Sequence, residues 1–364
     1  MRRHFNIAFF GSSLVSAYWN GAATYYRGII RALHERGHRV TFYEPDVYDR
    51  QAHRDMADPP WAKVIVYEPE DVHAALDSAT AADVIVKASG VGVHDELLER
   101  EVLSLRGPRT TVVFWDVDAP ATLERIANTP TDPFLELIPR YDLVLTYGGG
   151  APVVSEYRSR GARECVPIYN ALDPQTHHPV APDARFAGVL GFLGNRLPDR
   201  EARVREFFFE PARRHPEATF VLGGSGWGTD AAAPPNVQLI GHVSSNDHNA
   251  FNCTARAVIN INRDSMARVG FSPPTRVFEA AGAGACLLTD AWQGIELFLE
   301  PGQEVLVARD GAEVAEHVAR LDESIARRMG QQALRRIVAH HTYARRALEV
   351  EATLEATAPQ EAAA

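Results

Sequence analysis

Hydrophobic positions in the first part of the chain follow two periods, one typical of buried strands and one of helices. Short runs rich in valine, isoleucine and aromatic residues predict strands at residues 7–10, 39–43, 64–67, 84–87, 111–115 and 143–146. Helical spacing between them predicts helices at residues 22–36, 71–79 and 95–105. Strands that alternate with helices indicate a parallel sheet covered by helices on both faces.

The same alternation begins again after a stretch without periodicity. Residues 171–187 are rich in proline, histidine and aspartate, and we expect them to form an interdomain linker. Beyond them the pattern predicts strands at 189–193, 219–222, 237–240, 257–261, 285–289 and 305–308, and helices at 201–214, 246–253 and 312–329. We therefore predict an α/β protein with two Rossmann-like, doubly wound domains, residues 1–170 and 188–340, that face a central cleft. A last helix, at 341–358, is expected to return to the first domain.

Composition narrows the possible partners. The 364 residues carry 37 Lys and Arg against 47 Asp and Glu, a net charge of −10 that argues against nucleic-acid binding. The three cysteines are far apart and form no zinc motif, as in a reduced cytosolic protein. No apolar run has the length of a membrane span, and the first one is too short for a signal peptide. We expect a cytoplasmic protein without a bound metal, cofactor or integral membrane segment, of open oligomeric state.

The most informative segment joins a proline-stiffened loop to a small-residue helix. It contains Ser272, Thr275, Arg276 and Glu279. The start of a helix offers unpaired N–H groups and the positive end of the helix dipole to a phosphate. Arg276 adds a planar donor fork suited to a diphosphate, and Glu279, one turn later, can accept hydrogen bonds from sugar hydroxyls. The segment predicts a nucleotide-sugar site.

Two further loops follow strands of the second domain and are candidates for the same site. In the first, Gly194 and Asn195 precede Arg196 and Arg200, either of which could reach a phosphate. The alternative is a pair of solvated arginines at a helix start.

The second loop is a glycine-rich stretch that includes Gly224 and ends in Trp227. It could seat a base or ribose against the backbone, or form a flexible surface turn.

In the first domain the candidates are two carboxylates and one polar turn. Asp116 and Asp118 follow a buried strand and could act as a general base or bind hydroxyl groups, with Asp118 preferred because it lies next to Pro120 and nearer the end of the strand. Turn capping and a metal site are the alternatives, although alternate strand positions point to opposite faces. Gly11, Ser12 and Ser13 form a turn that could contact a diphosphate or an acceptor, or simply join strand to helix.

Several of these motifs together resemble the CgeB-type (spore maturation protein) glycosyltransferases, which are similar to the larger glycogen-synthase-like set of GT-B fold. The resemblance covers about residues 185–330 and is architectural over most of the first half. Its motifs are Phe192-Leu-Gly-Asn195, Asp199-Arg200, Gly223-Gly-Ser-Gly-Trp227, Asn260-Ile-Asn262, Arg276-Val-Phe-Glu279 and Glu296-Leu-Phe-Leu-Glu300.

The resemblance implies transfer of a sugar from a nucleotide-diphosphate sugar to an acceptor, without a metal. The second domain would bind the donor, Glu279 the ribose, and Arg276 and Arg196 the diphosphate. The first domain would bind a small-molecule or glycan acceptor. One position departs from the larger set: Phe271 stands where a glutamate eight residues before Glu279 would contact the sugar. A nucleotide-sugar epimerase and a non-catalytic nucleotide-sugar-binding protein are the alternatives.

Overall fold

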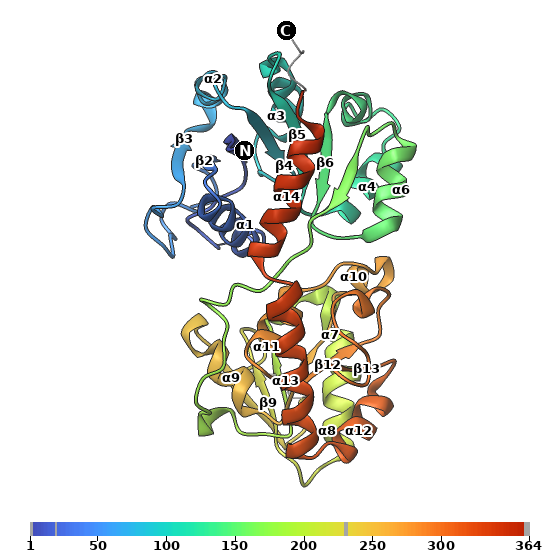
Figure 1. The fold of residues 1–364 in the computed structure, drawn as a ribbon. Helices are drawn as coiled ribbons and strands as arrows, with labels where there is room; N and C mark the ends of the chain where they lie inside the picture. Colours follow the sequence, from blue (N-terminus) through green and yellow to red (C-terminus); the bar gives the residue numbers. More distant parts are fainter. Residues whose placement is uncertain (1–2, 19, 229–231, 360–364) are drawn as a thin grey trace. The chain divides into compact units, whose positions relative to one another are not determined.

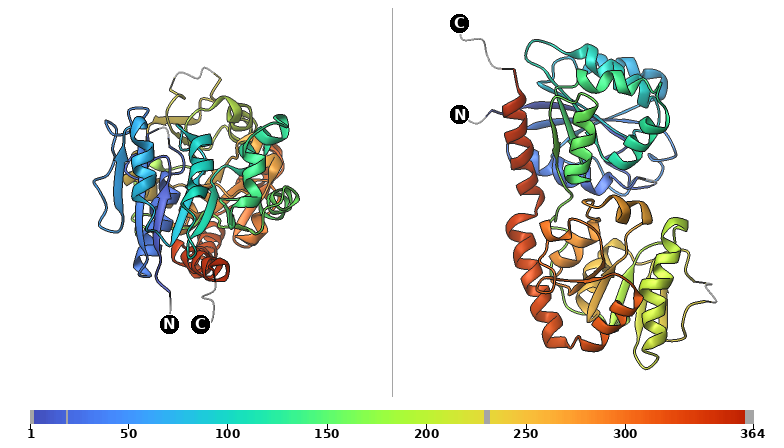
Figure 2. Two further views of the ribbon diagram at one scale, coloured as in Figure 1. Left: turned by 90° about the horizontal axis from the view of Figure 1, so that it is seen from above. Right: turned by 90° about the vertical axis from the view of Figure 1, so that its right-hand side faces the viewer.

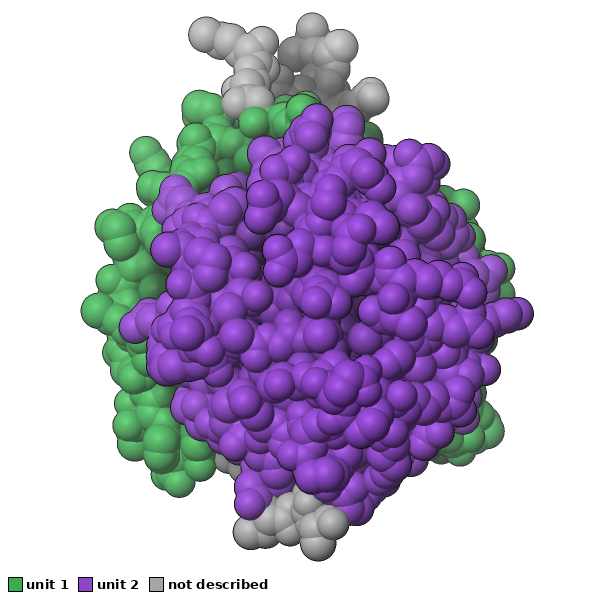
Figure 3. All heavy atoms as spheres, turned by 90° about the horizontal axis from the view of Figure 1, so that it is seen from below, with its two compact units in different colours: residues 1–170, 343–364 green, residues 171–342 purple. Residues whose placement is uncertain are grey.

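The chain folds into two compact units, each built on its own sheet (Figure 1). The computed structural model describes residues 3–18, 20–228 and 232–359. Unit 1 comprises Met1–Asn170 and Tyr343–Ala364, and unit 2 comprises Ala171–Thr342 (Figure 3). In both units every strand pairs in parallel with its neighbours. The predicted fold class, two parallel-sheet α/β domains, is confirmed.

Unit 1 has a seven-stranded sheet in the order β3-β2-β1-β4-β5-β6-β7. Its strands are β1 (Asn6–Phe10), β2 (Arg39–Pro45), β3 (Lys63–Tyr67), β4 (Val84–Ala88), β5 (Thr111–Asp116), β6 (Leu143–Thr146) and β7 (Cys165–Pro167). The order reverses between β1 and β4, where Ile7 pairs with Val40 on one side and Val84 on the other. Such a reversal opens a crevice at the carboxyl ends of the two central strands.

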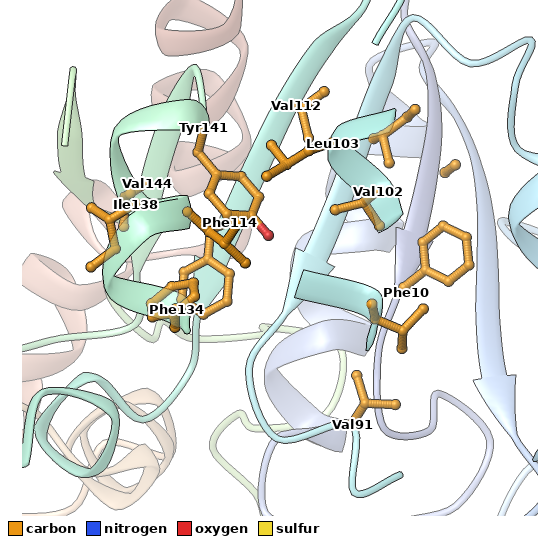
Figure 4. Packing of buried hydrophobic residues seen from close by; sticks show 14 of the residues in the cluster. Phe10, Val91, Val102, Leu103, Val112, Phe114, Phe134, Ile138, Tyr141 and Val144 are labelled. Carbon is orange, nitrogen blue, oxygen red and sulfur yellow. The ribbon is translucent and has the colours of Figure 1, made fainter. Parts of the chain in front are cut away.

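The helices of unit 1 cover both faces of this sheet. They are α1 (Ala23–Glu35), α2 (Val72–Ser78), α3 (Asp95–Glu101), α4 (Ala119–Asn128), α5 (Phe134–Leu137), α6 (Gly150–Ser159) and α14 (Tyr343–Thr357). On one face Phe114 packs with Phe134 and Tyr141, and Phe10 is another member of the same buried cluster (Figure 4). The alternate strand positions, such as Phe9, face α1 and α14, as the two-residue period of a strand requires.

Four helices and strands of unit 1 were not predicted, and one of them is the four-residue helix α5. Strand β7 has only three residues, too few to show a period. Helix α4 begins directly at Asp118, with Pro120 in its first turn, and helix α6 begins after Gly149, in the left-handed conformation. Proline and glycine resemble turn signals in the sequence, which hid both helices.

Unit 2 repeats the strand order of unit 1 with six strands, β10-β9-β8-β11-β12-β13. They are β8 (Leu190–Leu193), β9 (Phe220–Gly223), β10 (Val237–Gly241), β11 (Ala257–Asn260), β12 (Leu287–Asp290) and β13 (Val305–Ala308). Its helices are α7 (Pro198–Val204), α8 (Glu210–Arg214), α9 (His248–Thr254), α10 (Asp264–Val269), α11 (Thr275–Gly282), α12 (Gly311–Arg320) and α13 (Glu323–His340). Its order reverses between β8 and β11.

The single helix predicted at residues 312–329 is wrong, because the chain turns between α12 and α13. Asp322 is extended there, and its carboxylate accepts the N–H of Ile325 at 2.7 Å. This is the N-cap interaction that starts a new helix. The hydrophobic period continues across the break, so the pattern alone did not show it.

Residues 171–187, expected as a linker, belong to unit 2. The backbone N–H of Asp183 donates to Thr254 Oγ1 at 2.8 Å, and the N–H of Val180 contacts Cys253 Sγ at 3.4 Å. Both partners lie in or at the end of α9. The stretch has no sequence period because most of it forms no helix or strand. Side chains of α9 bind its backbone instead.

The last helix, α14, runs beside α1 as part of unit 1 (Figures 1 and 2). Tyr343 Oη donates to Asn170 Oδ1 at 2.5 Å, and Arg36 forms an ion pair with Glu351. The ring of Tyr343 lies against Gly28, where a Cβ would come within 2.2 Å of it. A residue without a side chain at position 28 is what lets the two helices approach.

Replacement of Gly28 by alanine should therefore destabilise unit 1. Alanine in a helix normally gains about 1 kcal/mol over glycine, but overpacking against Tyr343 should cost about 1–3 kcal/mol. Urea unfolding and hydrogen–deuterium exchange of α1 and α14 would show the loss. Gly21→Ala, where nothing lies within 4 Å of the new Cβ, is the control. A Gly28→Ala protein as stable as wild type would contradict the close packing.

Candidate functional site

Arg276 spans the point in unit 2 where the strand order reverses. It lies in the first turn of α11, and its guanidinium donates to the carbonyl of Leu193, at the end of β8. A second nitrogen, Nη1, lies 3.5 Å from Asn260 Oδ1, at the end of β11. Ligands of open parallel sheets bind in this crevice. The segment that the sequence singled out therefore reaches the carboxyl ends of both strands at the switch point.

The charge of Arg276 is poorly compensated. Burial lowers the pKa of its guanidinium to about 10, the charge of Arg200 acts in the same direction, and Glu279 opposes both. Arg276 and Arg200 both lie over the ring of Phe192, at 5.4 and 5.6 Å from its centroid. Within the described part of the chain neither arginine forms an ion pair with a carboxylate. Two like charges around one apolar ring favour an anionic ligand.

The start of α11 adds backbone donors beside this pair. Pro274 is extended at the N-cap, no side chain caps the helix, and its first turn carries no acidic residue. Thr275 is the first helical residue, and Ser272 is buried in the preceding loop. The positive end of the helix dipole is therefore left without an intramolecular anion.

Glu279 lies one turn after Arg276, close to a histidine that the sequence did not single out. Burial lowers the pKa of His248, and the charge of Glu279 acts against that shift. The charges of His177 and Arg276 act with burial. No residue in the described ranges donates a hydrogen bond to the Glu279 carboxylate. His248 opens α9 within a plain helical pattern, so no sequence signal marked it.

The glycine loops after β8 and β9 pack against each other. Gly224 has a φ of +135°, and a Cβ there would stand 2.2 Å from the carbonyl oxygen of Gly194. Asn195 Oδ1 accepts the N–H of Ser225 at 2.9 Å. Trp227 is buried and donates its indole N–H to the Gly194 carbonyl at 2.8 Å. Trp227 was a candidate for ligand binding, but its side chain packs inside unit 2 and supports the loop of Gly194 through this hydrogen bond.

The structure separates the two arginines of the first loop. Arg196 forms a two-point ion pair with Glu201, at 2.8 and 2.7 Å. Together with Arg205 it lowers the pKa of Glu201 to about 2. Arg200 instead donates to the carbonyl of Asn195 at 2.7 Å and keeps its charge available. The sequence left both arginines open and the family resemblance implied Arg196 for the diphosphate, whereas in the structure Arg200 is the arginine that shares the Phe192 ring with Arg276.

A buried polar network supports the crevice at the ends of β11 and β12. Asn260 Nδ2 donates to Thr289 Oγ1 at 3.1 Å, and the backbone N–H of Asn262 donates to Asp290 at 3.2 Å. Asp290 is fully buried and accepts from Arg203 at 2.6 Å. Through Asn260, which Arg276 contacts, the network fixes one side of the site.

Phe271 adopts the left-handed conformation, with a φ of +48°. Its N–H donates to the carbonyl of Gln293 at 2.6 Å, and its ring fills the space where Gly294 has no Cβ. A non-glycine residue in this region is strained and needs its surroundings to hold it. The loop before α11 is thus shaped by Phe271 at the position where the larger set has a glutamate.

In unit 1 the two aspartates have separate surroundings. Asp116 is fully buried and accepts from Ser89, from Thr122, from the N–H of Asp118 and from Tyr157 at 2.7, 3.0, 3.0 and 2.5 Å. Four donors leave it no role as a general base, so its expected catalytic part is not supported. Asp118 is exposed at the start of α4.

The turn of Gly11, Ser12 and Ser13 is also occupied by internal bonds. Ser12 Oγ donates to Asn20 Oδ1 at 2.9 Å, and Ser13 Oγ donates to the buried Glu44 at 3.0 Å. A Cβ on Gly11 would stand 2.5 Å from the ring of Phe42. The turn that could have contacted a ligand through its hydroxyls uses both of them to build unit 1.

The described residues form neither a metal-ligand cluster nor a membrane-spanning helix. Nowhere in residues 3–18, 20–228 and 232–359 do three or more histidine, cysteine, aspartate or glutamate side chains gather as a metal ion would need. Of the helices in that part of the chain, none combines the length and apolar character that a membrane crossing requires.

Comparison with known proteins agrees with this architecture. Residues 200–352 match the family described as glycosyl transferase-like. No curated protein matches the chain by sequence.

Solved GT-B glycosyltransferase structures match nearly the whole chain. HepE of Anabaena in complex with UDP and glucose is 15% identical, with a TM-score of 0.68 over 97% of this chain and 100% of that one. A sucrose-phosphate synthase from Thermosynechococcus elongatus is 13% identical, with a TM-score of 0.67 over 97% and 99%. The lipopolysaccharide outer core galactosyltransferase WaaB is 14% identical, with a TM-score of 0.61 over 96% and 99%. At such identities the likeness establishes the GT-B fold.

The surroundings of the two aspartates predict effects of different size on the free energy of unfolding. Asp116→Ala leaves several buried donors unpaired and should lower the free energy of unfolding by about 3 kcal/mol or more. Asp118→Ala should change it by less than about 1 kcal/mol, because the side chain is exposed. Urea unfolding of both variants measures the difference. Equal stabilities would show that the bonds around Asp116 are dispensable.

Proposed function

We propose that this protein is a glycosyltransferase that moves a sugar from a nucleotide-diphosphate sugar to an acceptor. The observation that carries the proposal is Arg276. It is a desolvated guanidinium at the switch point of unit 2, beside Arg200 and the uncapped start of α11, with no carboxylate partner among the described residues. The match of residues 200–352 to a glycosyl transferase-like family supports it. We further propose that it belongs to the CgeB-type group, on the motifs around Arg276 and Glu279.

The chemistry explains why two arginines are needed. As the bond between the sugar and the diphosphate breaks, negative charge grows on the departing diphosphate while the sugar becomes oxocarbenium-like. Donors that are already fixed can stabilise this charge without reorganisation. Arg276 is fixed by Leu193 and Asn260, and Arg200 by Asn195. Each charge-assisted hydrogen bond would contribute about 1.5–3 kcal/mol.

Glu279 is the proposed ligand of the ribose hydroxyls. It lies about one helical turn after Arg276 in α11, and no residue in the described ranges donates a hydrogen bond to its carboxylate. UDP is the first nucleotide to test, because HepE, of the same fold, was solved with UDP and glucose.

The acceptor step is assigned to unit 1. Asp118, exposed at the start of α4, is the proposed base for the acceptor hydroxyl, since Asp116 is held by four donors. Independence of metal ions and a cytoplasmic location remain predictions.

Loss of Arg276 or Glu279 should weaken nucleotide binding. Arg276→Ala and Glu279→Ala should each raise the Kd for UDP about tenfold or more, because each removes charge-assisted hydrogen bonds. Isothermal titration and thermal shift measure the effect. Arg309→Ala is the matched control, since Arg309 is an exposed arginine of the same unit that pairs with Glu313. Unchanged affinity in both site variants would refute this donor site.

Replacement of Asp118 by asparagine should separate transfer from donor binding. The loss of a general base predicts a decrease in turnover of about 10²–10⁴-fold. UDP affinity should be unchanged, because Asp118 and Arg276 belong to different units. UDP release from a UDP-sugar, with a sugar acceptor that supports turnover, measures the rate. Full activity of Asp118→Asn would exclude it as the base, and interconversion of donor sugars without acceptor would favour an epimerase.

A further inference from the structure

A second arginine spans the switch point of the other sheet. Arg50 Nη1 donates to the carbonyl of Ser12 at 3.0 Å and to that of Val91 at 3.2 Å. These carbonyls follow β1 and β4, the two strands between which the order of unit 1 reverses. Arg50 itself comes from the segment after β2. It therefore occupies in unit 1 the place that Arg276 occupies in unit 2.

The charge of Arg50 is buried without an ion pair. The residue is 5% exposed, and its Nε has no hydrogen-bond partner. Glu44 and Asp95 are close enough to act on its charge but form no ion pair with it within the described residues. Both are already engaged, Glu44 by Ser13 and a backbone N–H, and Asp95 by Lys87 and two backbone N–H groups.

Burial dominates the electrostatics of this arginine. It lowers the pKa of Arg50, although Tyr48 and Glu44 act in the opposite direction. A buried cation without full compensation is unfavourable unless a further anion joins it. A neutral donor could tie the loops of Ser12 and Val91 together without that cost, so loop closure alone does not account for an arginine.

The backbone around Arg50 is shaped to keep it in place. Tyr48 and Asp49, the two residues before it, are both left-handed, with φ of 58° and 56°. The Tyr48 ring lies 5.2 Å from the guanidinium, and its hydroxyl donates to the Gly92 carbonyl at 2.8 Å. Tyr48 is 57% exposed, so the ring that packs on the Arg50 guanidinium lies at the protein surface. Two strained residues in sequence are typical of a functional loop.

We propose that Arg50 binds an anionic group, a carboxylate or a phosphate, on the acceptor substrate. The proposal rests on the proposed function, because it assigns the chemical class of the acceptor in unit 1. Asp118 follows β5, which neighbours β4. The proposed base therefore lies, like Arg50, at the carboxyl ends of the strands of unit 1. An acceptor held by its charge at Arg50 would be oriented by a group remote from its reacting hydroxyl.

The test uses the full-length protein with Arg276→Ala, so that anions cannot bind at the donor arginine. Glucose 6-phosphate and glucuronate are the phosphate and carboxylate probes, and glucose is the neutral control. One of the two anions should raise the melting temperature at millimolar concentration, while glucose should not. The anion that raises the melting temperature identifies whether Arg50 binds a phosphate or a carboxylate. Equal responses to both anions and to glucose would overturn the proposal.

Variants of Arg50 locate the binding. Arg50→Gln should weaken the effective anion about tenfold or more, and Arg50→Lys less, because lysine keeps the charge but loses the planar fork. Arg163→Gln is the control. Arg163 is an arginine of unit 1 that lies just before β7, at the amino ends of the strands. If Arg50→Gln does not fold, the comparison of Arg50→Lys with wild type decides. Unchanged binding in the folded Arg50 variants would refute the assignment.

The donor site is measured separately. UDP binding to the Arg50 variants, with Arg276 intact, should match that of wild type. Failure of UDP to bind any of these proteins would count against the proposed function, whereas loss of anion binding only in Arg50 variants would still establish the site in unit 1.

Discussion

The structure depends on the reversal of strand order at the centre of each parallel sheet. The chain leaves β1 and β4 in opposite directions, and likewise β8 and β11, and carbonyl groups at or just after these strand ends accept hydrogen bonds from an arginine side chain. One guanidinium meets them in each unit, Arg50 in the first and Arg276 in the second. Arginine can do this because it has five N–H donors, so that it can meet two acceptors and still leave other N–H groups for a ligand.

Two carboxylates in the segments around these arginines form their hydrogen bonds with other partners. Glu201 pairs with Arg196, and Glu44 is held by Ser13 and the backbone. Arg276 and Arg50 are therefore left with carbonyl oxygens, which carry partial charge only. The protein has a net charge of −10, yet among the described residues neither arginine forms an ion pair with a carboxylate, and this is why both are proposed to bind anionic ligands.

The sequence was sufficient for the architecture, and it singled out the segment on which the proposed donor site is based, because both follow from local patterns. Strand and helix periods showed the doubled parallel fold, and the proline-to-helix junction marked Arg276 and Glu279. It could not decide between Arg196 and Arg200, since that choice depends on which arginine Glu201 reaches in space. Arg50 and His248 were missed for a similar reason. Each lies in an ordinary segment and gains its importance only from loops or helices distant in sequence.

The division of the chain bears on how the protein can be made. Unit 2 is one continuous segment, whereas unit 1 needs α14 to cover the sheet face that carries Ile7 and Phe9. During synthesis unit 2 can complete its core while that face of unit 1 still waits for its last helix. The first 170 residues alone would expose a strip of apolar side chains and invite aggregation. A circular permutant that places α14 ahead of β1 would remove this delay.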